Sequence, residues 1–338
     1  MRQDFEYTPD RNPHALRSRE ILKKYPQIRE FMKPYPLTSL FIVLVTAIQL
    51  VTGYFIVAKD LNIWWILLLA YTVGALCNHA LYVLMHDAGH DAIFKSRFWN
   101  RIWCIFTNIG QAFPSAMSFR TFHNIHHSNL NEYDYDADLA FHKEAKWVRN
   151  IWWRKALWFM FFFAVEVARP MRLKKGKVFD KWMVGNFLFI ILTDIAIYKF
   201  IGPWALGYLM ISTLFSVGLH PVGARWIQEH YTYREGQETY GYYGPMNLLQ
   251  FNIGYHNEHH DFYKVPWVHL PKIRAIAPEY YNNLYYHTSW TKLILDFIFN
   301  PERDLYLRIV RKRDKSDRLR ELNEKNSTDP SSSLSIGK

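Results

Sequence analysis

The sequence predicts an all-α integral membrane protein with about four transmembrane helices and a helical cap outside the bilayer. Half of its 338 residues are hydrophobic and 17% are aromatic, and both fractions are high for a soluble protein. Mean hydropathy is nonetheless only -0.18, so apolar segments must alternate with large polar parts. Several apolar runs are also close to the roughly 20 residues that a helix needs to cross the hydrocarbon core.

The spanning segments are expected to form two hairpins, the second around a Gly202-Pro203 turn. The predicted spans are residues 37–57, 63–84, 182–200 and 204–217. The N-terminal segment, residues 1–36, is rich in Lys and Arg and should remain cytoplasmic. Two hairpins return the chain to the cytoplasm each time. We therefore expect residues 37–310 to form one membrane domain, with its cap and both termini in the cytoplasm.

Three other segments are harder to place from their composition. Two further apolar stretches, residues 99–116 and 151–167, contain polar interruptions and many aromatic residues. This composition favours helices that lie in the membrane interface, although each stretch could also cross the bilayer. The tail, residues 311–338, is charged and then Ser-rich, so we expect it to be disordered and cytoplasmic.

The charge and the cysteines exclude other classes of protein. The net charge is +11, but the Lys and Arg residues gather in the termini and beside apolar runs, where anionic headgroups attract them. We therefore expect the membrane as a partner, and no nucleic acid. Cys77 and Cys104 both lie in apolar stretches, which argues against a disulfide framework and a cysteine metal site.

Eight of the 15 histidines fall into three tight clusters. The clusters are His86-Asp-Ala-Gly-His90, His123-Asn-Ile-His126-His127 and His256-Asn-Glu-His259-His260. On a helix, residues at i, i+3 and i+4 project from one face, so each cluster can direct its imidazoles to a common point. One such cluster arises easily by chance, whereas three together do not. Eight nitrogen ligands are too many for one metal ion and suit two, although imidazole ligands alone do not name the metal.

The three clusters, in this order and with membrane hairpins before the first and between the second and third, resemble the membrane fatty-acid desaturase and hydroxylase superfamily. Within it, three segments resemble the sphingolipid Δ4-desaturases. They are Lys24-Tyr-Pro26, the run that begins Glu238-Thr-Tyr-Gly-Tyr-Tyr-Gly-Pro, and Asn252-Ile-Gly-Tyr-His-Asn-Glu-His-His-Asp-Phe262. Front-end desaturases carry Gln where this chain has His256. The chain also has Arg2 where some animal members have a myristoylated glycine.

This resemblance implies a non-haem di-iron centre that uses O2 to insert a trans C4=C5 double bond into a dihydroceramide-like lipid. It further implies residence in the endoplasmic reticulum membrane and electrons from NADH through cytochrome b5 reductase and cytochrome b5. Because the sequence contains no flavin or nicotinamide motif, a partner must deliver the electrons. A sphingolipid C4-hydroxylase, a bifunctional enzyme and a desaturase of another lipid remain alternatives. A zinc membrane hydrolase is disfavoured, because no HExxH motif is present.

Members of this superfamily supply one or two further ligands after the fourth span, which makes His230 and His220 candidates. Four carboxylates beside the clusters are candidate hydrogen-bond acceptors for the ligand imidazoles: Asp87, Glu229, Glu258 and Asp261. His79 lies seven residues before His86, and we interpret it as a buried structural residue. The other histidines are interpreted as surface or packing residues; they are His14, His142, His269 and His287.

Overall fold

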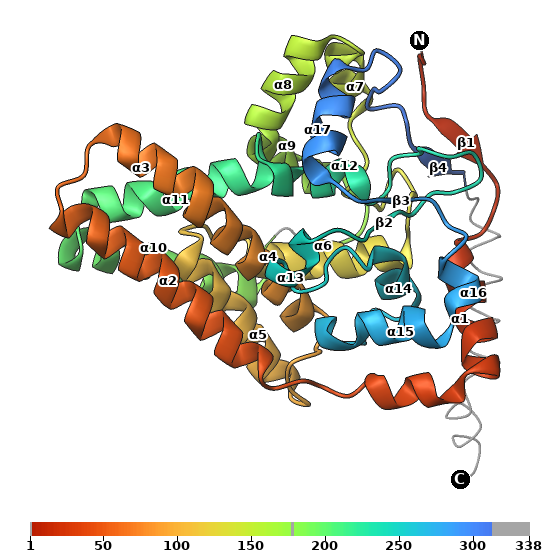
Figure 1. Ribbon diagram of the computed structural model, residues 1–338, viewed down its shortest axis with the longest axis horizontal. Coiled ribbons are helices and arrows are strands. Elements are labelled where there is room, and N and C mark those ends of the chain that lie inside the picture. The colour runs from red at the N-terminus through yellow and green to blue at the C-terminus, as the bar shows by residue number, and fades with distance from the viewer. Residues whose placement is uncertain (1, 177–178, 313–338) are drawn as a thin grey trace.

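The computed structural model describes residues 2–176 and 179–312, and this part of the chain is mostly helical (Figure 1). The described strands are short and form two parallel pairs. Strand β1 (Glu6–Thr8) pairs with β4 (Ile309–Arg311), and β2 (Gly241–Tyr242) pairs with β3 (Tyr286–His287). The predicted helical class is confirmed.

Among the described residues, three helical segments are long and apolar enough to cross a membrane. They are α2 (Thr38–Ala58), the run Ile63–Gly89, and α10 (Lys181–Phe200). The second consists of α3 (Ile63–Leu69), a π-helical turn (Ala70–Gly74) and α4 (Ala75–Gly89). Helix α11 (Pro203–Val217) passes the same test together with residues 221–228, across a bend of 41°. These helices agree with the four predicted spans, and α4 continues further than expected, as far as the first histidine cluster.

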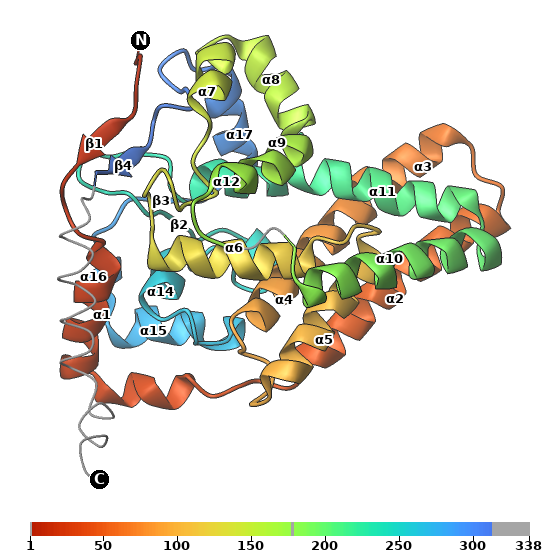
Figure 2. The same ribbon diagram turned by 180° about the vertical axis from the view of Figure 1, so that it is seen from behind.

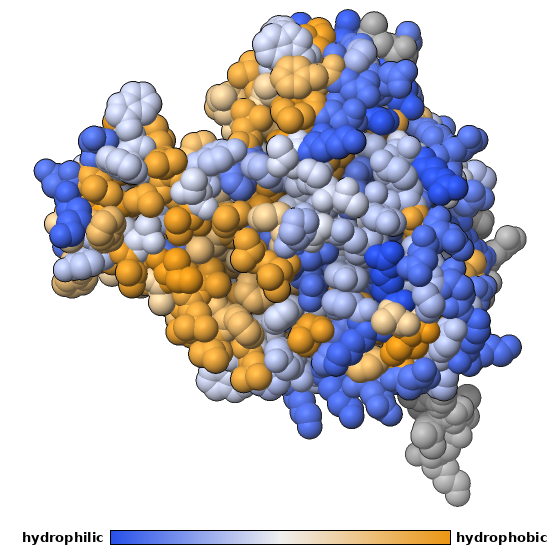
Figure 3. All heavy atoms as spheres, in the orientation of Figure 1, coloured by the Kyte–Doolittle hydropathy of each residue, from blue (hydrophilic) through white to orange (hydrophobic). Residues whose placement is uncertain are grey.

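The candidate spanning helices of the described chain project together from one side of the molecule, and the cap lies on the other side (Figures 1 and 2). Hydrophobic residues dominate the surface of the projecting part, and hydrophilic residues dominate the cap (Figure 3). Large apolar side chains on α2 and α10, such as Val51, Leu192 and Phe200, are 65%, 68% and 87% exposed. Such a surface suits lipid rather than water.

Polar side chains inside the bundle satisfy one another. Gln49 of α2 is fully buried, and its Nε2 donates to the main-chain carbonyls of Gly74 and Gly110. Its Oε1 accepts a hydrogen bond from the hydroxyl of Tyr208 on α11 at 2.7 Å. Because hydrocarbon offers no competing partners, these contacts hold α2 and α11 against the π-helical turn.

The two apolar stretches that we predicted to lie in the membrane interface form short helices. Residues 99–116 contain most of α5 (Arg97–Thr107) and the start of α6 (Ala116–Ser128). Residues 151–167 contain α8 (Trp152–Met160) and most of α9 (Phe162–Ala168). At 7–13 residues each, these helices are too short to cross the hydrocarbon core.

The remaining helices build the cap around the ends of the spans. They are α1 (Pro13–Lys24), α7 (His142–Val148), α12 (Arg225–Gln228), α13 (Met246–Leu249), α14 (His256–Asp261), α15 (Leu270–Ile276), α16 (Pro278–Tyr281) and α17 (Trp290–Phe299). In the core of the cap, Trp290 stacks on Tyr242 with 4.2 Å between ring centroids. Phe297 packs edge-on against Phe159 of α8, so α17 joins the α8 segment to the rest of the cap.

The two ends of the described chain meet in the β1–β4 pair, where Glu6 lies opposite Ile309. Arg311, which we predicted as the start of a disordered tail, is instead buried in β4. Its guanidinium pairs with Glu238 and donates to the carbonyl of Leu130 at 3.0 Å. The predicted disorder is therefore wrong at Arg311, because the buried carboxylate of Glu238 pairs with the charged guanidinium of Arg311. The rest of the predicted tail, residues 313–338, lies outside the described residues.

Candidate metal centre

The three histidine clusters lie on three different helices, α4, α6 and α14. His86 is near the end of α4 and His90 is the residue that follows this helix. The second cluster occupies the last turns of α6, and the third begins α14. Helical spacing therefore aims the side chains of each cluster in one direction, and the packing of α4, α6 and α14 brings the clusters together.

Five imidazoles form the first group. Its members are His86, His90, His123, His127 and His259, whose ligand nitrogens all lie within 4.8 Å of one another. The Nε2 atom of His259 lies 2.9 Å from Nε2 of His86 and 2.9 Å from Nε2 of His127. Nε2 of His127 lies 3.0 Å from that of His123. A metal ion with nitrogen ligands at about 2.1 Å and at right angles would separate neighbouring nitrogens by about 3.0 Å.

A second group lies beside the first. It contains His126, His230 and His260, again with all ligand nitrogens within 4.8 Å. His256 adjoins it, because its Nε2 lies 3.0 Å from Nε2 of His230. The rings of His127 and His260 stack with 4.3 Å between centroids, so the two groups are neighbours.

Several ring nitrogens in these groups have no protein partner. Both nitrogens of His90, and the Nε2 atoms of His126 and His260, are buried without a hydrogen bond among the described residues. Burial and neighbouring imidazoles lower the pKa of His123, His127 and His259 well below its usual range. Neutral, unpartnered imidazoles are the form that binds a metal ion, so the residues present fit two ions.

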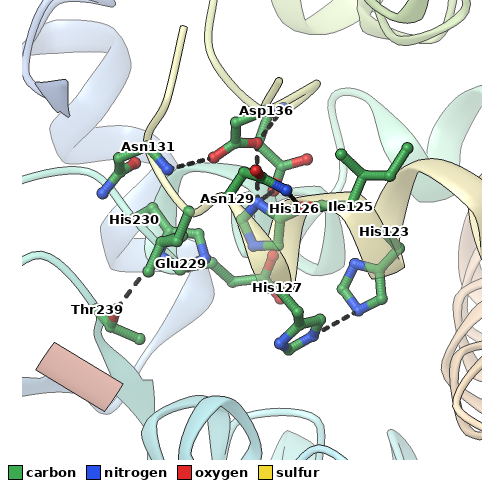
Figure 4. A network of polar contacts seen from close by, with 12 residues as sticks. His123, Ile125, His126, His127, Asn129, Asn131, Asp136, Glu229, His230 and Thr239 are labelled. Atoms are coloured by element: carbon green, nitrogen blue, oxygen red, sulfur yellow. Dashed lines mark hydrogen bonds and ion pairs between the residues drawn. The ribbon is translucent and has the colours of Figure 1, made fainter. Parts of the chain in front are cut away.

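His126 is oriented by two carboxylates that sequence reasoning missed. Its Nδ1 lies 2.8 Å from Asp136 and 3.5 Å from Asp138 (Figure 4). Although burial alone would lower the pKa of His126, these carboxylates outweigh it and raise the pKa to about 9. They hold the proton on Nδ1, so a metal ion that binds His126 displaces only the proton on Nε2, which faces the second group. The acidic run at residues 132–138, directly after the second cluster, was the available signal.

His230 and Glu229 follow α12, and the structure places His230 in the second group. His230 Nδ1 lies 3.2 Å from the carbonyl of Glu238, which leaves Nε2 for the group. Glu229 lies 3.5 Å from Nδ1 of His256 and 2.6 Å from Nη1 of Arg225. Glu229 therefore lies between His256 and a buried arginine, but Nδ1 of His256 has no hydrogen-bond partner among the described residues.

The other three candidate carboxylates have different partners. Asp87 accepts from the main-chain N–H of Trp267 at 3.0 Å and is 3.8 Å from His86, too far for a hydrogen bond. Glu258 accepts from the hydroxyl of Tyr243 at 2.7 Å. Asp261 binds the N-terminal helix α1, through His14 and Arg17. The structure gives neither Glu258 nor Asp261 a hydrogen bond with a ligand imidazole.

His220 is not brought together with either group. It caps the turn Pro221–Ala224, where its Nδ1 accepts from the N–H of Val222 at 3.2 Å, so this candidate ligand has a structural role instead. His79 is buried, with Nδ1 2.6 Å from Gln250 and Nε2 3.2 Å from Arg225. Both ring nitrogens of His79 therefore have hydrogen-bond partners within the protein, and His79 is a buried structural residue, as predicted.

An apolar cavity of about 410 Å³ borders the first group. His123 lines it, together with aromatic and aliphatic residues from α6, α9, α10 and α11. Its walls also include residues of the candidate span α10, such as Val184 and Leu188. The centre thus combines two sets of imidazoles with a space that suits an alkyl chain.

Comparison with known proteins identifies the class. The fatty acid desaturase family model matches residues 62–291, a range that includes the three clusters and His230. The chain belongs to this family and is an oxidoreductase that acts on a lipid substrate at the membrane. Together with the two histidine groups, membership indicates the use of two iron ions and O2.

The relatives place the chain more narrowly within the family. A model described as sphingolipid Delta4-desaturase (DES) matches residues 1–37. Sphingolipid delta(4)-desaturase DES1 of Homo sapiens is 38% identical over 312 residues, which cover 92% of this chain and 95% of that protein. The DES1-like protein of Oryza sativa is 38% identical over 317 residues, covering 94% and 95%. DES1 of Xenopus tropicalis is 36% identical over 313 residues, covering 92% and 96%.

Proposed function

We propose that the chain is a sphingolipid Δ4-desaturase, which inserts a trans C4=C5 double bond into the sphingoid base of a dihydroceramide-like lipid. The observation that carries the proposal is the pair of adjacent histidine groups, with His123 on the wall of an apolar cavity. The sphingolipid substrate is supported by relatives that match over nearly the whole chain and by the N-terminal family model.

The chain's residues hold, orient and shield the reacting parts. Two iron ions with O2 supply the oxidising power that an unactivated C–H bond requires. The nine clustered imidazoles would hold these ions, and Asp136 keeps His126 in the tautomer that leaves Nε2 free. The apolar walls of the cavity would exclude water from the two adjacent carbons, each of which loses one hydrogen atom.

We propose that electrons arrive from NADH through cytochrome b5 reductase and cytochrome b5, and that the protein resides in the endoplasmic reticulum membrane. The basic residues of the N-terminal segment support a cytoplasmic cap. Lys23, Lys24, Arg29 and Lys33 are exposed on the segment that packs against α14. They would attract an acidic electron donor to the side of the molecule that carries the metal centre.

The test is expression in a yeast host that lacks its own sphingolipid C4-hydroxylase, with long-chain bases profiled by mass spectrometry. We expect a Δ4-unsaturated base that disappears in a His259→Ala variant, because His259 links the nitrogens of the first group. Membrane levels of both proteins, measured by immunoblot, control for expression.

A 4-hydroxylated base in place of the unsaturated one would assign the chain as a C4-hydroxylase, and both products would assign a bifunctional enzyme. If neither base forms while the protein is present and cytochrome b5 is supplied, the sphingolipid assignment is wrong. A search of the total fatty acids for new double bonds would then identify a desaturase of another lipid.

A further inference from the structure

The apolar cavity beside the metal centre opens toward the membrane. Met171, Phe179 and Leu188 line it, and they are also 72%, 78% and 56% exposed. Residues that line a cavity and are exposed as well mark its opening. Leu188 belongs to the candidate span α10, so this opening lies beside a surface that is apolar enough to contact lipid.

The wall of this cavity also carries charged side chains, which is unusual for a site that takes only an alkyl chain. Four charged side chains contribute to its wall: Asp138, Glu166, Arg225 and Glu229. Arg225 is the buried cation among them, with a side chain only 4% exposed. It lies over the rings of Tyr82 and Trp226, at 4.8 and 4.3 Å from their centroids.

Arg225 has an unused hydrogen-bond donor. Its Nη1 donates to Glu229 at 2.6 Å and its Nε to His79 at 3.2 Å. Nη2 is buried and has no hydrogen-bond partner among the described residues. A buried donor without a partner costs roughly 1–3 kcal/mol, so an acceptor supplied by a ligand would stabilise this arrangement.

Three other polar residues in the same wall, Asn78, Gln111 and Thr213, are hydrogen-bonded to one another. The side chain of Asn78 donates to the hydroxyl of Thr213 at 2.7 Å, and that hydroxyl donates to the carbonyl of Gln111 at 2.6 Å. Gln111 in turn donates to the carbonyl of Asn78 at 3.4 Å. These three residues satisfy one another, whereas Nη2 of Arg225 has no hydrogen-bond partner among the described residues.

Packed side chains lie between Arg225 and both histidine groups. Tyr82, the ring partner of Arg225, contacts Phe119 with 4.7 Å between centroids, and Phe119 stacks on His123 at 4.7 Å. On the other side of Arg225, Glu229 lies between it and His256. An atom bound by Arg225 is therefore held at a fixed position relative to the metal centre.

We propose that Arg225 binds an oxygen atom of the polar end of a ceramide-class lipid, either the amide carbonyl or the C3 hydroxyl, and so determines which carbon lies beside the first histidine group. This inference rests on the proposed function. Both oxygens lie within a few bonds of C4, so a hydrogen bond to either fixes the position of that carbon. A lipid without the oxygen would leave the guanidinium unpaired, and the site would reject it.

The test measures binding, with the purified full-length iron-loaded chain in lipid nanodiscs and radiolabelled dihydroceramide as the probe. Competitors are unlabelled dihydroceramide, its 3-deoxy analogue, and an ether analogue that lacks the amide. We expect at least one analogue to compete on the order of tenfold or more weakly than dihydroceramide. The analogue that is weakened identifies the oxygen bound by Arg225.

An Arg225→Gln variant should bind dihydroceramide and that analogue with equal affinity, and Arg225→Lys should restore part of the difference. The matched control is Arg19→Gln, because Arg19 is an exposed arginine on α1. Iron content is measured for each variant, since Arg225 also supports Glu229. If Arg225→Gln misfolds, the competition experiment on the unaltered chain still tests the inference, because equal affinity for the three lipids would contradict it.

Equal affinity of the unaltered chain for all three lipids would overturn the inference, as would a preference that survives in Arg225→Gln. In either case formation of the Δ4 product would leave the proposed function standing. Failure of the unaltered chain to bind dihydroceramide would overturn the inference and the proposed function together.

Discussion

His14 Nδ1 lies 2.7 Å from Asp261 Oδ1, although 247 positions separate the two residues. On the other side of the ring, His14 Nε2 lies 2.8 Å from the hydroxyl of Thr239. The ring of His14 lies 4.9 Å from that of His260, between centroids. The N-terminal segment, which matches the sphingolipid Δ4-desaturase model, therefore closes over the third histidine cluster.

We expect His14→Ala to loosen the N-terminal segment and to weaken iron binding in the second group. Asp261 would keep Arg17 and Tyr281 as partners, but His260 would lose the ring that packs on it. Limited proteolysis of residues 1–36 should become faster, and iron per chain should fall after dialysis against a chelator. Glu20→Ala, an exposed change on the same helix, serves as control. Unchanged protease resistance and iron content would contradict this role.

Separate substitutions should remove the two metal ions one at a time. His126→Ala should release the ion of the second group, and His259→Ala that of the first, because each removes a member of one group only. Plasma mass spectrometry of the purified variants should give about half the iron of the unaltered chain. His220→Ala should keep all of it, since His220 lies in neither group. Full iron in His126→Ala would show that its Nε2 is not a ligand.

Close packing at the π-helical turn makes Gly74 intolerant of a side chain. A Cβ at Gly74 would lie 2.0 Å from Oγ of Ser212 on α11, so Gly74→Ala should destabilise the bundle by about 1–3 kcal/mol. Gly185→Ala on α10 is the matched control, because nothing lies within 4 Å of its added Cβ. Thermal melting in detergent should show a lower Tm for Gly74→Ala and an equal or higher Tm for Gly185→Ala. Equal values for the two variants would refute tight packing at Gly74.

Lys155 should make stability increase with pH in the alkaline range. Its fully buried Nζ donates to the carbonyls of Phe297 and Asn300, and burial lowers its pKa from 10.5 to about 8. Between these values the folded chain holds fewer protons on Lys155 than the unfolded chain, so stability rises as pH rises. The Tm of the unaltered chain, minus that of Lys155→Met, should therefore increase from pH 7 to pH 10. Lys146→Met, at an exposed position, should show no such trend; an equal trend in both variants would rule out burial as the cause.

The spans and the ligand clusters were predictable because each depends on short-range patterns. Length and apolarity alone indicated α2, α10 and α11, and the spacing of three to four residues indicated the faces that carry the imidazoles. The partners of the ligands were not predictable in the same way. Asp136 was missed and Asp261 was assigned to a ligand, because proximity along the chain does not say which way a carboxylate points.

By itself, the sequence determined a helical membrane protein with three histidine clusters suited to two metal ions, since local spacing and hydrophobicity are properties of the chain. Only the tertiary structure decided how the ligands divide, with His126 separated from His123 and His127 although they share one helix. It also placed Arg225 in the cavity wall and His14 over His260. These relationships depend on how α1, α6, α12 and α14 pack, and contacts between distant segments leave no periodic signal in the sequence.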